Sequence, residues 1–89
     1  GDARETLEPA LDYYQQQSKA GARGTTFNHD YAYALYVSAI SRTDDAAGRR
    51  LRTADLDQAA KLIAGTSAEA QRLASMRYLS GLIAASRTQ

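Results

Sequence analysis

Apolar residues recur along the chain at intervals of three and four, which is the spacing of an amphipathic helix. The pattern predicts four main helices, over residues 7–20, 29–42, 54–64 and 67–85, behind a flexible lead over residues 1–6. Pro9 falls in the first turn of the first helix, where backbone N–H groups have no intrahelical acceptor, so the N–H group that proline lacks costs no hydrogen bond. Gly21 marks the end of that helix.

The second predicted helix has the least polar sequence. No residue between Tyr31 and Ile40 is charged, and apolar or small side chains occupy nearly every direction around the axis. A helix of this kind is buried on most sides. Asn28 has the residue type of an N-cap, and Phe27 has the position of a hydrophobic staple. We therefore expect this helix at the centre of the fold.

The second half of the chain predicts a connector and a helical hairpin. Residues 42–52 are dense in charge and are expected to contain the chain's one hinge. Thr53 is expected to cap the third helix, and Gly65 to end it. Thr66-Ser67-Ala68-Glu69 then has the pattern of a capping box. Because this connection is so short, the third and fourth helices should be antiparallel neighbours.

Composition agrees with an all-α fold. Of 89 residues, 44% are hydrophobic, and alanine and leucine greatly outnumber valine and isoleucine, which favours helix over strand. We expect one soluble, all-α domain of helical hairpins, either an irregular four-helix bundle or a tetratricopeptide-like pair, with no sheet and no membrane span. The hairpins resemble two tetratricopeptide-type repeats, but the tryptophan, glycine, alanine and proline positions of that repeat do not align at its period of about 34 residues.

Charge and cysteine content exclude several classes of function. The formal net charge is +1, so no global field attracts nucleic acid or anionic lipid. The chain has no cysteine, which excludes disulfides, thiolate metal sites and cysteine nucleophiles. Alanine and arginine richness suggests a bacterial protein, and the start at Gly1 is consistent with removal of an upstream leader or domain. These features do not determine the cellular compartment of the protein, but they favour export over the cytoplasm.

The only histidine lies next to an aspartate. His29 and Asp30 have the residue types of an acid-base pair, but adjacent side chains point about 100° apart on a helix, so they are not expected to face each other. One histidine without cysteine cannot assemble a zinc shell, and no serine lies in a nucleophile motif. We expect no cofactor, no metal and no enzymatic activity.

The tyrosines are the candidate partner-binding residues. They are Tyr13, Tyr14, Tyr31, Tyr33 and Tyr36. Most of them are expected to pack in the core, but tyrosine is also common at protein interfaces. The primary hypothesis is a small helical protein-interaction module, an accessory or scaffold part of a bacterial complex, whose aromatic surface on the first two helices binds a segment of another protein.

The alternative hypothesis is a nucleic-acid-binding accessory domain. Its phosphate contacts would be Arg42, Arg49, Arg50 and Arg52. Asp44 and Asp45 lie in the same segment and offset much of that positive charge. No helix-turn-helix spacing accompanies the cluster, and Asp55 and Asp57 begin the next predicted helix, where they would repel a phosphate backbone. Nucleic acid is therefore the less favoured partner.

Overall fold

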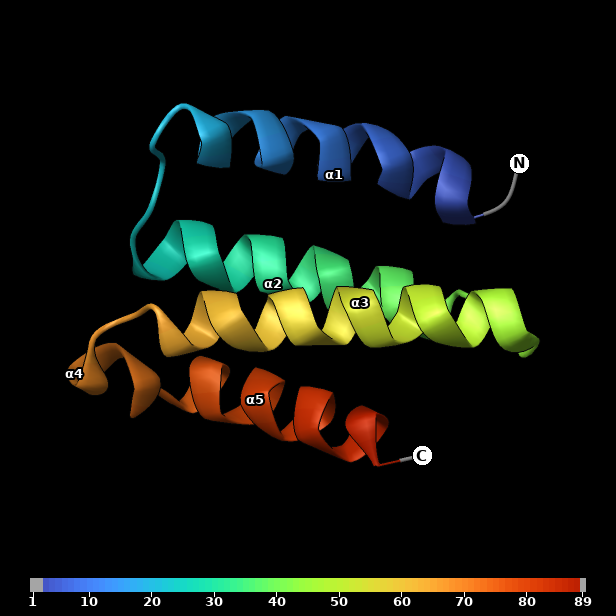
Figure 1. The fold of residues 1–89 in the computed structure, drawn as a ribbon. Coiled ribbons are helices and arrows are strands. Elements are labelled where there is room, and N and C mark those ends of the chain that lie inside the picture. The colour runs from blue at the N-terminus through green and yellow to red at the C-terminus, as the bar shows by residue number, and fades with distance from the viewer. Residues whose placement is uncertain (1–2, 89) are drawn as a thin grey trace.

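The computed structural model describes residues 3–88, which form an all-α bundle without a strand (Figure 1). Its helices are α1 (Ala3–Lys19), α2 (Thr25–Ile40), α3 (Ala46–Ala64), α4 (Ala68–Gln71) and α5 (Ala74–Arg87). The four long helices run back and forth in chain order, and the single turn α4 joins α3 to α5 (Figure 1). The predicted all-α arrangement of packed helices is confirmed.

The core lies between α2, α3 and α5, while α1 packs mainly on α2. Ten buried side chains form it, namely Tyr31, Ala32, Leu35, Ala39, Leu56, Ala59, Ile63, Met76, Leu79 and Ile83. Ala32, Ala39 and Ala59 are completely buried, and such small side chains let α2 and α3 approach closely. Helix α2 is therefore central, as its lack of charge predicts.

Helix α1 begins at Ala3, earlier than the predicted start at residue 7. Its first turn is attached to α2 by Arg4, whose Nη1 donates to Ser41 Oγ at 2.7 Å and to the Ser38 carbonyl oxygen at 3.2 Å. Arg4 also contacts Glu8, one turn later in α1. These tertiary contacts extend the helix before Pro9, and of the predicted lead only Gly1 and Asp2 lie outside the described residues.

Helix α2 also begins before its predicted cap. Gly24, with a φ of +130°, precedes its first residue, and Asn28 lies inside the helix. The side-chain amide of Asn28 is buried and donates to the Leu62 carbonyl oxygen at 2.8 Å, which ties α2 to the end of α3. Gly21 has a φ of +100°, which only glycine adopts readily, and it ends α1 as predicted.

The predicted hinge is wrong, because residues 46–52 belong to α3. Asp45 rather than Thr53 caps this helix, and its carboxylate accepts a hydrogen bond from the Gly48 amide at 2.7 Å. That bond and the hydroxyl of Thr43, at 2.9 Å, hold the pKa of Asp45 below its ordinary value of 3.8. Helix α3 ends before Gly65, as predicted.

The predicted fourth helix is divided in two. Ser67, not Thr66, caps α4, and its Oγ accepts from the Ala70 amide at 3.0 Å. The Thr66 hydroxyl instead donates to the Ile63 carbonyl oxygen and closes the end of α3. The helix is interrupted at residues 72 and 73, and α5 then packs along α3. The predicted antiparallel hairpin is thus present, with α4 as its connection.

Candidate functional site

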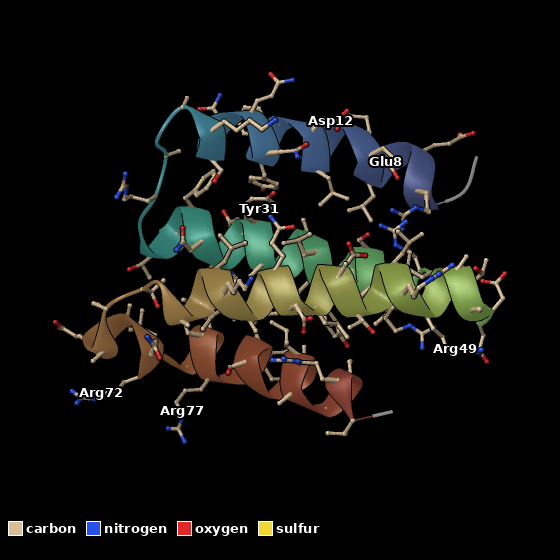
Figure 2. All side chains as sticks on the ribbon, viewed as in Figure 1. Glu8, Asp12, Tyr31, Arg49, Arg72 and Arg77 are labelled. Atoms are coloured by element: carbon tan, nitrogen blue, oxygen red, sulfur yellow. The ribbon has the colours of Figure 1, made fainter. Side chains whose placement is uncertain are left out.

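An aromatic cluster joins the end of α1 to the beginning of α2. The Tyr14 ring stacks on Tyr31, with a centroid distance of 5.5 Å and an interplanar angle of 16°. Phe27 packs edge-on against both rings at 5.9 Å. Tyr31 lies between α1 and α2 (Figure 2), and its hydroxyl accepts a hydrogen bond from Gln58 Nε2 of α3 at 2.9 Å. Tyr14 and Tyr31 are therefore packing residues that fix α1 on the bundle.

The other candidate tyrosines differ in accessibility. Tyr36 packs against the core and is partly buried, whereas Tyr13 is 60% exposed and Tyr33 is 49% exposed. The five side chains do not form one continuous aromatic face, because the helices turn some inward and others outward. Among these five tyrosines, only Tyr13 and Tyr33 are exposed to solvent.

An open, mainly apolar groove of about 370 Å³ runs between α1 and α2. One wall is Leu7, Ala10 and Tyr14 of α1, and the other is Tyr33, Ala34 and Val37 of α2. Both walls have helical spacing, so each presents one continuous stripe. Two further exposed apolar side chains extend these stripes, since Tyr13 follows Ala10 by three residues and Ile40, which is 57% exposed, follows Val37 by three.

His29 and Asp30 form the polar end of this groove. His29 Nδ1 lies 3.1 Å from Asp30 Oδ1, so the expectation that the two side chains do not face each other is wrong. The imidazole also stacks on Tyr33, with an interplanar angle of 16°. Within residues 3–88, no cluster of three or more histidine, aspartate or glutamate residues could hold a metal ion.

A buried polar network links α1, α2 and α3, and the sequence analysis missed it. The Asp55 carboxylate accepts from Ser38 Oγ at 2.8 Å and from Arg42 at 3.0 and 3.3 Å. Ser38 also accepts from Arg4 at 3.1 Å. Ser38 is completely buried and Asp55 is 9% exposed, so Asp55 is not the exposed helix-start acid that the sequence suggests. The one signal of this burial in the sequence is that the charged residue Asp55 directly precedes Leu56, which belongs to the apolar stripe of its helix.

The structure separates the four candidate arginines. Arg42 is held by Asp55 and is not available to a ligand. Arg49 and Arg50 are exposed on α3, and Arg49 lies 3.5 Å from Asp44. Arg52 is half-buried, and together with Arg49 it lines a cavity that also includes Arg87 of α5. Arg87 lies 35 residues after Arg52 along the chain, so no local pattern in the sequence places it beside this cluster.

Compared with protein-family models, with curated proteins and with solved structures, the chain matches none. In the part of the chain that the structure describes, no helix is both long and apolar enough to cross a lipid bilayer.

Proposed function

We propose that this domain is a non-catalytic protein-interaction module whose groove between α1 and α2 binds an amphipathic helix of a partner protein. The observation that carries the proposal is the apolar groove itself, bordered by the exposed side chains of Tyr13, Tyr33 and Ile40. Apolar surface that is clustered and left open by a folded domain is typical of an interaction site. An accessory or scaffold role in a bacterial complex is the biological setting that we propose for it.

A helix is the occupant that the groove fits best. Leu7 to Tyr14 along one wall spans eight residues, or about 10 Å of helix rise, and Tyr33 to Ile40 gives the same length on the other wall. Two turns of a partner helix match that length, with apolar anchors at positions i, i+3 or i+4, and i+7. Aromatic side chains at the border supply large contact areas that lose little conformational entropy on binding.

The groove is supported at both ends. The stack of Tyr14 on Tyr31 holds the end of α1, and the hydrogen bonds of Arg4 to Ser38 and Ser41 hold its beginning. Between these two attachments α1 packs mainly on α2, so the walls of the groove have defined positions before a partner arrives. A preformed groove lowers the conformational cost of binding.

Charge favours a partner helix with basic flanks. In residues 3–40 four acidic side chains outnumber three lysines and arginines, whereas in residues 41–88 eight basic side chains outnumber five acidic ones. Asp30 lines the groove, and Figure 2 shows Glu8 and Asp12 on α1, at the edge of the bundle opposite Arg72 and Arg77. Lysine or arginine beside the apolar anchors of the partner helix would complement these carboxylates. On the α5 side, where Arg72 and Arg77 lie, the same basic side chains of a partner would be repelled.

The test is a selection from a displayed library of amphipathic helical peptides, followed by fluorescence anisotropy with the enriched peptides. Tyr33→Ala and Tyr13→Ala should each weaken binding by about 1–2 kcal/mol without unfolding the domain. Tyr78→Ala is the matched control, because Tyr78 is 69% exposed but lies on α5, outside the groove. Affinity should change little with salt, since most of the contact is apolar.

Three outcomes would contradict the proposal. One is a selection that enriches no helical peptide. Another is an enriched peptide whose affinity is the same for Tyr33→Ala, Tyr13→Ala and the unaltered domain. The third is an equal loss of affinity with Tyr78→Ala, because that result would indicate binding through exposed tyrosine in general and not through the groove.

A further inference from the structure

A second cavity, of about 310 Å³, lies between residues 49–57 of α3 and the last turn of α5. Its polar lining consists of Arg49, Arg52, Thr53, Asp57, Ser86 and Arg87. Three arginines and one aspartate give this small space a formal excess of two positive charges. It is separate from the groove between α1 and α2, and its chemistry is that of an anion site.

The main observation about this cavity concerns Arg52. Its Nε is buried and has no hydrogen-bond partner among residues 3–88. Buried polar groups are normally hydrogen-bonded, because removing an unpaired N–H group from water is unfavourable. An N–H group of a permanently charged guanidinium therefore calls for an acceptor, and an anionic acceptor suits it best.

The other two arginines of the cavity have partners that they can exchange. Arg87 Nη2 lies 3.1 Å from Asp57 Oδ1, but both side chains are about half exposed. Arg49 lies 3.5 Å from Asp44, and that pair is still more exposed. Exposed ion pairs contribute little to stability, so either guanidinium can turn toward a ligand at low cost. Thr53 and Ser86 add hydroxyl groups that can donate to ligand oxygens.

We propose that this cavity binds the phosphate group of a small phosphate monoester. Arg52 donates to the phosphate from the base of the site, and Arg49 and Arg87 complete the binding from α3 and α5. A phosphate monoester carries close to two negative charges and three acceptor oxygens, which matches both the excess charge and the several directions of the donors. A cavity of about 310 Å³ is at the small end of ligand pockets, so the rest of the molecule is small.

A nucleic-acid backbone fits this region less well. Arg42, the fourth arginine of the sequence cluster, is held by Asp55 and is not one of the residues that line the cavity. Asp57 lines the cavity itself, while Asp44 and Asp45 lie just before α3. Carboxylates in these positions repel a line of phosphates, whereas a single compact phosphate needs to contact only the arginines.

The test titrates the intact 89-residue domain with inorganic phosphate and with phenyl phosphate at constant ionic strength, with chloride as the control anion. Proton–nitrogen NMR spectra follow the Nε–H resonances of the arginines. The Arg52 resonance should shift with saturation for both phosphates, and not for chloride. Phenyl phosphate should bind more tightly than inorganic phosphate if the source is a small ester, and equal binding would assign the site to free phosphate.

Variants then assign the site to Arg52. Arg52→Met should weaken phosphate binding by at least about tenfold, and Arg52→Lys, which keeps the charge but loses the planar fork, should also weaken it. Arg50→Met is the matched control, because Arg50 is an exposed neighbour outside this cavity, and it should change affinity by less than about twofold. Circular dichroism confirms that each variant is folded.

The proposal is overturned if the Arg52 resonance of the unaltered protein shows no saturable shift with either phosphate. It is also overturned if Arg50→Met weakens binding as much as Arg52→Met, since the attraction would then be diffuse. A single-stranded DNA oligonucleotide that binds more tightly than phenyl phosphate, with steep salt dependence and equal loss in both variants, would favour the nucleic-acid function instead.

Discussion

Two aspartates of α3 provide a direct test of how burial controls the strength of an ion pair. Asp55 pairs with Arg42 at 3.0 Å, and their side chains are 12% and 19% exposed. Asp57 pairs with Arg87 at 3.1 Å, but both of those side chains are 48% exposed. The shortest contacts of the two pairs have nearly the same length and both aspartates lie on α3, so replacing each aspartate by alanine compares the loss of a buried acceptor with the loss of an exposed one.

Asp55→Ala should cost about 3 kcal/mol, at the lower end of the roughly 3–5 kcal/mol for breaking a buried pair, because Arg42 can still reach some solvent. The change removes the acceptor of two Arg42 hydrogen bonds and of the buried Ser38 hydroxyl. Asp57→Ala should cost less than about 1 kcal/mol, because water screens and replaces an exposed pair. A domain of this size has a total stability of only about 4–13 kcal/mol, so the first loss is a large fraction of it.

Urea unfolding followed by far-ultraviolet circular dichroism measures both losses. With an m-value of about 1–2 kcal/mol/M, Asp55→Ala should lower the midpoint by about 2 M and Asp57→Ala by well under 1 M. Adding Arg42→Met to Asp55→Ala should cost little more, because the guanidinium has already lost its partner. A difference of less than about 1 kcal/mol between the two single variants would refute the reasoning that burial decides the strength of these pairs.

Two further predictions concern the beginning of α3 and the middle of α5. A Cβ on Gly48 would overlap the carbonyl oxygen of Thr43, whereas a Cβ on Gly81 meets nothing within 4 Å. Gly48→Ala should therefore destabilise the domain by about 1–3 kcal/mol, and Gly81→Ala should stabilise it by about 0.5–1 kcal/mol. Thermal unfolding midpoints that shift in the same direction for both variants would contradict this. Because the pKa of Asp45 is lowered in the folded state, its contribution to stability is present above pH 3.8 and is lost as the pH falls through the lower folded pKa. Asp45→Asn should flatten the decline in stability below about pH 4, and an unchanged acid limb in urea melts from pH 5 to pH 2 would show that this cap does not contribute.

The attachment of α1 explains why the proposed binding groove and the stability of the domain can be tested separately. Tyr14 and Tyr31 hold α1 and are poor sites for a binding test, because their loss would loosen the helix as well. Tyr13 and Tyr33 are exposed and lie outside the buried core, so truncating either should change recognition without changing the fold. Exposure therefore divides the five candidate tyrosines into those that pack in or against the core and those that remain available to contact a partner.

Local spacing and residue type along the chain are enough to predict several features of this fold. Apolar periodicity predicted the all-α class, the lack of charge from Tyr31 to Ile40 predicted the central position of α2, and Gly21 and Gly65 predicted two helix ends. Local patterns were less reliable for helix starts, since Asn28 and Thr53 have the residue type of caps but lie inside helices. Capping preference is weak enough for tertiary contacts to override it.

Which polar groups meet depends on the packing of the helices and cannot be predicted from local patterns. Asp55 can be buried because its carboxylate accepts hydrogen bonds from Ser38 of α2 and from Arg42, which follows α2. The spacing of these three residues along the chain does not predict that contact. The cavity that Arg52 shares with Arg87 likewise forms because α5 returns along α3. Such sites depend on contacts between residues far apart in sequence, whereas periodicity reports only which side of its own helix a residue occupies.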